Sequence, residues 1–291
     1  MTQRRQAPTA RLRRLAMELR QLRERSGLSR EQVAEATEIN RATLYRIEMA
    51  QAKPQIRTLR ALLDAYGVPE KHRNDLITVL KSAQEESWLQ AASGDLPDQY
   101  ATYIGFEQEA TGIRNYESSF VPGLLQTEAY ARAAIPGGAP ELPAAEVESR
   151  VTARMARQAK RDSSPAIEAI IDEAVLRRHV GSPEIMREQL QRLLDESAQN
   201  HLTLQAIPFE AGVHPGMHGS FVILQFADDI RSVVYIEAST TDLFLDSEND
   251  VRRYNLMFEH LRGIALSPEK TRDLVARVLA DVEVRGGAGD A

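Results

Sequence analysis

The chain has 291 residues, of which 43% are hydrophobic and 27% charged, a composition that excludes a fully disordered or fibrous protein. Its length favours two domains over one small module. It contains no cysteine, which excludes disulfide frameworks, thiolate zinc sites and cysteine nucleophiles and fits a reducing compartment. No apolar stretch approaches the roughly 18 residues of a membrane-spanning helix. We therefore expect a cytoplasmic protein without a membrane partner.

The net charge of −6 is unevenly distributed. Of the 36 basic and 42 acidic residues, 14 and 8 lie within residues 1–70, so this segment is basic and the remainder is acidic. A basic segment can neutralise DNA phosphates, whereas an acidic one suits protein or small-molecule contacts. The first 14 residues hold five arginines and no acid. They form either an arm that lies along DNA or a solvated tail.

The spacing of leucines predicts a first amphipathic helix over residues 10–25. A second helix is expected over 30–36, because Ser29 and Gln32 form a capping-box pattern just ahead of it. After a turn at 37–39, Asn40 is a candidate N-cap for a third helix that ends near Ala50, and a fourth helix covers 56–66. Two short helices joined by a tight turn are typical of a helix-turn-helix.

The third helix has the two faces that a recognition helix requires. At about 100° per residue, Leu44 and Ile47 fall together on a buried face. The opposite, exposed face carries Arg41, Ala42, Tyr45, Arg46 and Met49. Arginine can bind guanine through two hydrogen bonds, alanine can contact a thymine methyl, and tyrosine can reach a phosphate or sugar. This face is therefore predicted to enter the major groove.

Other polar residues lie where phosphate contacts are common. Arg30, Gln32 and Thr43 are close to helix starts, and Lys53 lies in the turn after the third helix. Such contacts fix the register of a protein on DNA without reading its sequence. The full predicted DNA-binding set is Arg30, Gln32, Asn40, Arg41, Ala42, Thr43, Tyr45, Arg46 and Lys53.

Residues 12–68, which include GLSREQVAEATEINRATLYRIEMAQAKPQIRTLRALLDAYGV, resemble the Xre class of helix-turn-helix repressors. The resemblance implies sequence-specific binding to double-stranded DNA, usually as a homodimer, with the third helix in the major groove. Two positions depart from the class. Glu38 and Ala50 stand where many relatives have glycine, so the turns there are expected to be adjusted or mildly strained.

Apolar spacing extends the helical pattern over residues 70–92, which include Trp88, the only tryptophan. Trp88 is expected to pack between the domains or in a dimer interface. A break in this pattern at residues 93–97 marks the domain boundary. We predict a DNA-binding domain at 1–69, a helical linker at 70–97, a regulatory domain at 98–283 and a disordered tail at 284–291.

The regulatory domain is expected to be α+β, with one mostly antiparallel sheet covered by helices. Helices are predicted near residues 98–113, 123–135, 143–161, 183–199, 248–265 and 268–283. Strands are predicted at 166–171, 202–208, 219–227 and 232–238. The last two are expected to form a hairpin.

This domain shows no pattern that indicates catalysis. His214 and His218 are four residues apart, but Pro215 and Gly216 prevent the helix that would bring them to one face, so a structural loop is favoured over a metal site. The sequence has no nucleophile elbow, Walker loop or dinucleotide-binding glycine pattern. We therefore predict no enzyme activity, cofactor or metal.

Four segments carry a second resemblance, to the C-terminal domain of actinobacterial WhiJ-like regulators. They are IRNYESSFVPGLLQTEAYARA at 113–133, VTARMARQ at 151–158, IDEAVLRRHVGSPEIMREQL at 171–190 and PFEAGVHPGMHGSFVILQF at 208–226. The resemblance implies a transcriptional regulator of development or antibiotic production. We expect a nucleoid-associated protein that represses developmental or antibiotic genes. It also implies a small acidic partner protein of the BldB-like type, in an arrangement likened to a toxin–antitoxin pair.

Three hypotheses remain open. In the first, the C-terminal domain binds a small acidic protein that changes the affinity for DNA. In the second it holds a small effector, which predicts a sizeable apolar cavity with a few polar groups. In the third the chain is an enzyme with a DNA-targeting module, which would require a convergent set of titratable residues.

Overall fold

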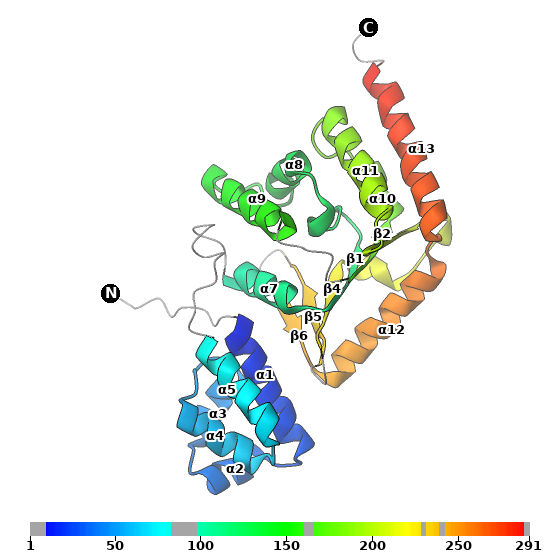
Figure 1. Cartoon of the computed structure of the whole chain (residues 1–291). Coiled ribbons are helices and arrows are strands. Elements are labelled where there is room, and N and C mark those ends of the chain that lie inside the picture. Colours follow the sequence, from blue (N-terminus) through cyan, green and yellow to red (C-terminus); the bar gives the residue numbers. More distant parts are fainter. Residues whose placement is uncertain (1–9, 83–97, 160–165, 228–230, 239–241, 288–291) are drawn as a thin grey trace. The chain divides into compact units, whose positions relative to one another are not determined.

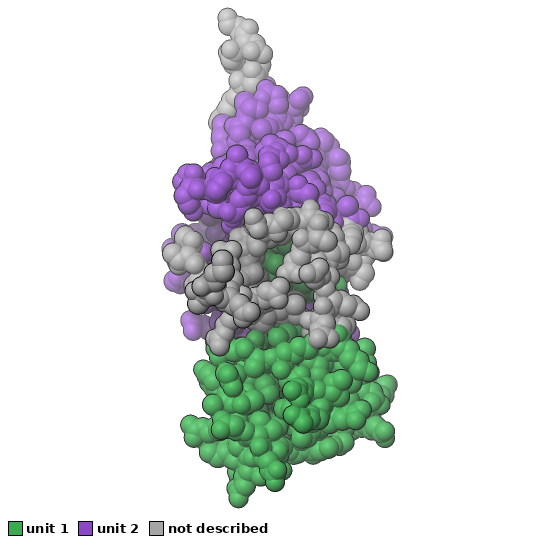
Figure 2. Space-filling view, turned by 90° about the vertical axis from the view of Figure 1, so that its left-hand side faces the viewer, with its two compact units in different colours: residues 1–91, 97–108 green, residues 92–96, 109–291 purple. Residues whose placement is uncertain are grey.

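A computed structural model describes residues 10–82, 98–159, 166–227, 231–238 and 242–287. The chain divides into two compact units, which Figure 2 distinguishes by colour. Unit 1 comprises residues 1–91 and 97–108, and unit 2 comprises residues 92–96 and 109–291. No helix within the described ranges is long and apolar enough to cross a membrane.

Unit 1 is helical, as predicted (Figure 1). Its described helices are α1 (Ala10–Arg25), α2 (Arg30–Thr37), α3 (Arg41–Glu48), α4 (Ile56–Ala65), α5 (Glu70–Ser82) and α7 (Asp98–Glu109). The first four begin within a residue of their predicted starts. The predicted continuation of the fifth helix to residue 92, with Trp88, and the Arg-rich arm before residue 10 lie outside the described residues.

Leucines and other apolar residues at helical spacing form the core of α1 to α5. Its buried members include Leu15, Leu19, Val33, Leu44, Ile47, Leu59, Leu62, Leu63, Leu76 and Leu80. Each helix contributes at least one of these side chains, so burial of apolar surface holds α2 and α3 at a fixed angle to the rest. This packing positions the face of α3 that remains exposed.

Unit 2 contains a six-stranded sheet in the order β3-β2-β1-β4-β5-β6. The strands are β1 (Gly112–Glu117), β2 (Ala166–Asp172), β3 (Leu202–Ile207), β4 (Phe221–Gln225), β5 (Val233–Ile236) and β6 (Leu243–Leu245). Strands β4 and β5 pair antiparallel, which confirms that the two segments are antiparallel neighbours. The prediction missed β1 and β6, and it placed the first residues of β1 in a helix.

The sheet is mixed, which corrects the prediction of a mostly antiparallel sheet. Strand β1 pairs parallel with β2, and β2 pairs parallel with β3. The pairings β1–β4, β4–β5 and β5–β6 are antiparallel. Parallel neighbours need a crossover connection. Helices are predicted in both crossovers, at 123–135, 143–161 and 183–199, whereas the short helix at Glu173–Arg177 is not predicted.

Those crossovers are α8 (Glu128–Gly138) and α9 (Ala144–Ala159) between β1 and β2, and α10 (Glu173–Arg177) and α11 (Pro183–Ser197) between β2 and β3. Within the described residues, short 3-10 helices lie at Gly123–Leu125, Phe209–Ala211 and Pro215–His218. The chain continues with α12 (Glu248–Ile264) and α13 (Pro268–Gly287).

Helix α12 packs its buried Phe258 and Leu261 against a cluster from the sheet that includes Tyr116, Ile170 and Phe221. Helix α13 lies along α11 (Figure 1). It reaches Gly287 and so includes residues 284–287 of the segment expected to be a disordered tail. Residues 288–291 lie outside the described part of the chain.

Candidate nucleic-acid interface

The starts of α2 and α3 are each held by the cap that the sequence predicts. The amide of Gln32 donates to Oγ of Ser29 at 3.2 Å, and Oε1 of Gln32 accepts from the amide of Ser29 at 2.8 Å. Oδ1 of Asn40 accepts from the amide of Ala42 at 2.8 Å. Both capping predictions are confirmed. The side chains of Gln32 and Asn40 are thus already used within the protein.

The two non-glycine residues at expected glycine positions both adopt a left-handed backbone conformation. Glu38, in the turn between α2 and α3, and Ala50, just after α3, each have a φ of 55°. An L-residue in this region brings its Cβ close to the following carbonyl oxygen. Both turns therefore have the backbone geometry that glycine would favour, and both residues are mildly strained.

Helix α3 has the predicted division into a buried and an exposed face. Leu44 and Ile47 are buried in the core of unit 1. Arg41, Ala42, Tyr45, Arg46 and Met49 are all exposed. Tyr45 and Met49 are 46% and 42% exposed, which is high for large apolar side chains. The exposed face thus offers two arginines, a tyrosine and a methyl group for contacts with a partner.

A buried carboxylate at the end of α3 ties three helices together. Nε of Arg23, in α1, lies 2.6 Å from Oε1 of Glu48, and Nε of Arg30, in α2, lies 2.7 Å from Oε2. The Glu48 side chain is fully buried. Burial and the nearby Glu48 carboxylate raise the pKa of Tyr66, whose hydroxyl has no hydrogen-bond partner within the described residues. Sequence reasoning missed this cluster because its members are distant along the chain.

Arg30 is predicted to contact a phosphate, for which its side chain would extend into solvent. Instead, the side chain is held by Glu48. The Arg30 guanidinium also lies over the Tyr45 ring, 5.5 Å from its centroid, in cation–π geometry. It is 32% exposed and so still reaches the surface. Arg30 therefore links the buried carboxylate to the exposed face of α3.

Some of the predicted DNA-binding residues line one hollow on the surface of unit 1, and the others lie outside it. A hollow of about 640 Å³ in unit 1 is lined by Arg23, Ser29, Arg30, Glu31, Arg41, Ala42 and Tyr45. Arg46 and Thr43 lie on α3 outside this lining, with Nη2 of Arg46 3.4 Å from Oγ1 of Thr43. Lys53 is exposed in the turn before α4. At the hollow, Nη1 of Arg41 lies 2.8 Å from Oε1 of Glu31, which the sequence did not suggest as a site residue.

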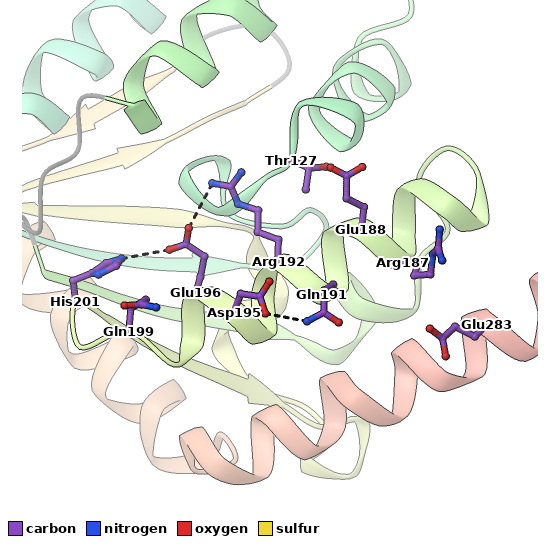
Figure 3. A pocket seen from close by; sticks show the side chains of 10 residues that line it. All are labelled: Thr127, Arg187, Glu188, Gln191, Arg192, Asp195, Glu196, Gln199, His201 and Glu283. Atoms are coloured by element: carbon purple, nitrogen blue, oxygen red, sulfur yellow. Dashed lines mark hydrogen bonds and ion pairs between the residues drawn. The ribbon is translucent and has the colours of Figure 1, made fainter.

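Unit 2 has a hollow of about 900 Å³ along α11, shown in Figure 3. Its lining includes Arg187, Glu188, Arg192 and Asp195 from α11, with His201 just beyond the helix. Nε2 of His201 lies 3.4 Å from Oε2 of Glu196. These side chains carry charges of both signs, so the hollow differs from the apolar cavity that an effector site was expected to show.

The two histidines of the loop between β3 and β4 differ in their surroundings. His214 is buried, with Nε2 3.3 Å from Oδ2 of Asp172, whereas His218 is exposed. Nδ1 of His214 and the hydroxyl of Tyr116 have no hydrogen-bond partner within the described residues. No cluster of three or more histidine, aspartate or glutamate side chains suited to a metal occurs in the part of the chain that the structure describes.

A carboxyl group with an altered pKa lies at the end of β1. Burial raises the pKa of Glu117 to about 7, although hydrogen bonds with Ser220 and Asn115 favour its ionised form. Nδ2 of Asn115 lies 3.2 Å from Oε1 of Glu117. Glu117 therefore titrates near neutral pH, which matters for the stability of unit 2.

Comparison with known protein families identifies both parts of the chain. Residues 14–76 match a helix-turn-helix domain, which supports a DNA-binding regulator. Residues 100–277 match a domain of unknown function, DUF5753. No curated protein and no solved structure matches the chain. Because the second match covers more than half of its residues, the chain belongs to the DUF5753 family.

Proposed function

We propose that this protein is a sequence-specific transcriptional regulator of the Xre class, which binds double-stranded DNA as a homodimer and inserts α3 into the major groove. The observation that carries the proposal is the division of α3 into two faces. Leu44 and Ile47 anchor the helix in the core, while Arg41, Tyr45 and Arg46 remain exposed within a matched helix-turn-helix domain. A recognition helix needs this arrangement.

The exposed residues take different roles in this proposal. Arg41 and Arg46 read base edges, and Ala42 allows the helix to approach the groove closely. Lys53 and Arg30 contact phosphates, with Thr43, Asn40 and Gln32 near the backbone. Because Arg30 also binds Glu48 at 2.7 Å, its replacement would disturb both the fold and the contact. Lys53 is therefore the better probe of a phosphate contact.

The experiment is a selection of preferred sites from random double-stranded DNA, followed by affinity measurements on single-base variants of the selected site. Arg46→Ala should cost about 1–3 kcal/mol at the selected site and relax one base position. Lys53→Ala should weaken binding to all sequences alike and reduce the salt slope by about one. A protein that selects no sequence, or binds no DNA, would overturn the proposal.

We further propose that the protein represses transcription at the nucleoid and that its DUF5753 domain binds a small acidic partner protein. The support is the resemblance of residues 113–133, 151–158, 171–190 and 208–226 to WhiJ-like regulators. A small-molecule effector is the less favoured alternative, because the hollow along α11 is lined by polar and charged residues and by no hydrophobic side chain. Native mass spectrometry of the full chain captured from its host distinguishes the two: a stoichiometric acidic protein supports the first, and a bound metabolite supports the second.

A further inference from the structure

We propose that Glu31 is a positioning residue that determines specificity at the DNA interface. It holds the Arg41 guanidinium in an orientation that favours guanine over a phosphate. The inference rests on the proposed function and deepens it by assigning a role to an acidic residue in a surface otherwise suited to a polyanion.

The two residues meet where α2 and α3 both begin. Glu31 is the second residue of α2 and Arg41 is the first residue of α3, and Oε1 and Nη1 lie 2.8 Å apart. The side chains are 60% and 69% exposed, respectively. Exposed ion pairs contribute little to stability, because solvent screens the two charges. An acid in the first turn favours helix α2 by itself, so the contact with Arg41 adds little to fold stability.

The position of Glu31 also disfavours a phosphate. The start of a helix attracts anions through its free amides, but here a carboxylate occupies the first turn of α2. Its own backbone amide, and then Arg41, lower the pKa of Glu31, so the group is ionised at neutral pH. A DNA phosphate approaching this point meets a negative charge, which costs affinity without regard to sequence.

The same ion pair leaves Arg41 able to read a base. A guanidinium has five N–H donors, and only its Nη1 group lies next to the Glu31 carboxylate, in an ion pair. The edge formed by Nε and Nη2 can still donate two hydrogen bonds to O6 and N7 of guanine. These acceptors are uncharged, so partial neutralisation of Arg41 weakens its attraction to phosphate more than to guanine. A held side chain also loses less conformational freedom on binding.

This arrangement predicts opposite effects on affinity and specificity. Glu31→Gln removes a negative charge near DNA and should raise affinity for all sequences, with a steeper salt dependence. Loss of the held orientation should lower discrimination at one guanine position by about two- to tenfold. A residue that only supports the fold would change affinity for every sequence in the same direction and leave base preference unaltered.

The test compares Glu31→Gln with Glu35→Gln, Arg41→Ala and the double variant Glu31→Gln/Arg41→Ala in the full chain. Glu35 is an exposed acid on the same helix, so its replacement is a matched control for charge. Dissociation constants are measured by fluorescence anisotropy on the selected site and its single-base variants at two salt concentrations. Circular dichroism verifies that each variant remains folded.

The expected result is that Glu31→Gln relaxes the same base position as Arg41→Ala and that Glu35→Gln relaxes none. The double variant should have the same base preference as Arg41→Ala. Equal base preferences for Glu31→Gln and Glu35→Gln would overturn the inference, as would a change in base preference by Glu31→Gln that persists without Arg41. If Arg41→Ala relaxes no base while Arg46→Ala does, the inference fails and the proposed function stands. A wild-type protein without sequence preference overturns both.

Discussion

The carboxylate of Glu48 is fully buried at the end of α3, and its Oε1 lies 2.6 Å from Nε of Arg23 in α1. Removal of one partner from a buried ion pair leaves the other charge without compensation. Glu48→Ala should therefore destabilise unit 1 by about 3–5 kcal/mol. Urea unfolding, with hydrogen exchange measured for peptides from α1 to α4, checks this value.

Glu24 provides the matched control, because it also contacts Arg23 but lies at the surface. Its Oε1 is 3.7 Å from Nη2 of Arg23, and its side chain is 51% exposed. Glu24→Ala should cost about 0–1 kcal/mol. If Glu48→Ala and Glu24→Ala lower the free energy of unfolding equally, the buried ion pair of Glu48 does not stabilise unit 1 more than a surface contact does.

The left-handed conformations of Glu38 and Ala50 predict that glycine stabilises unit 1 at these two positions. The left-handed region costs an L-residue about 1–2 kcal/mol, whereas glycine loses about 0.5–1 kcal/mol more conformational freedom on folding. Glu38→Gly and Ala50→Gly should each add about 0.5–1 kcal/mol to the free energy of unfolding. Glu35→Gly, within α2, should instead lose about 1 kcal/mol. Destabilisation by all three variants in urea unfolding would contradict the strain argument.

The pKa of Glu117 makes the stability of unit 2 depend on pH. Its carboxyl has a pKa of about 7 in the folded chain and 4.5 as a free group, so the folded state holds a proton that the unfolded state has lost. Stability from this group is complete below pH 4.5 and falls as the pH rises to about 7, by about 3 kcal/mol in total. Glu117→Gln should remove this fall. Urea unfolding between pH 5 and 8 measures it.

An exposed acid of unit 2, Glu141, is the control for the pH experiment. Glu141→Gln should leave the pH dependence of unfolding as it is in the wild type. A dependence that survives Glu117→Gln would show that another group is responsible.

Gly216 is predicted to tolerate no side chain, because it lies directly against the Tyr116 ring. A Cβ atom at Gly216 would lie 2.4 Å from Cζ of Tyr116, which is fully buried. Gly216→Ala should therefore destabilise unit 2 by about 1–3 kcal/mol. Gly137→Ala is the control, because this helical glycine has open space around its Cβ position and should gain about 1 kcal/mol. Thermal unfolding of both variants tests this prediction, and an unchanged unfolding temperature for Gly216→Ala would contradict it.

Much of unit 1 could be predicted because its signals are local. The capping box of Ser29 and Gln32 involves residues three apart, and the buried face of α3 follows from the spacing of Leu44 and Ile47. The strained positions Glu38 and Ala50 were found because a residue other than glycine stands in a turn. The links from Glu48 to Arg23 and Arg30 could not be found, because they join residues 25 and 18 positions apart.

In unit 2 the prediction failed where pairing partners are distant. Strand β1 has six residues, and its burial pattern does not alternate, because side chains on both faces of the strand are buried. The sequence of β1 therefore lacks the alternation by which a half-buried strand is predicted. Strand β6 has three residues, too few for any period. The contact between His214 and Asp172 joins residues 42 apart. Only the three-dimensional structure brings such groups together.

The position of β1 in the sheet has a consequence during protein synthesis. The helices α1 to α5 are complete by residue 82, so they can fold early as the nascent chain leaves the ribosome. Strand β1 pairs with β2 and β4, and the register with β4 joins Gly112 to Gln225. Its apolar side chains must therefore wait for most of unit 2 to be translated, and a chain that stalls between β1 and β4 presents an unpaired strand edge on which chaperones or other nascent chains can act.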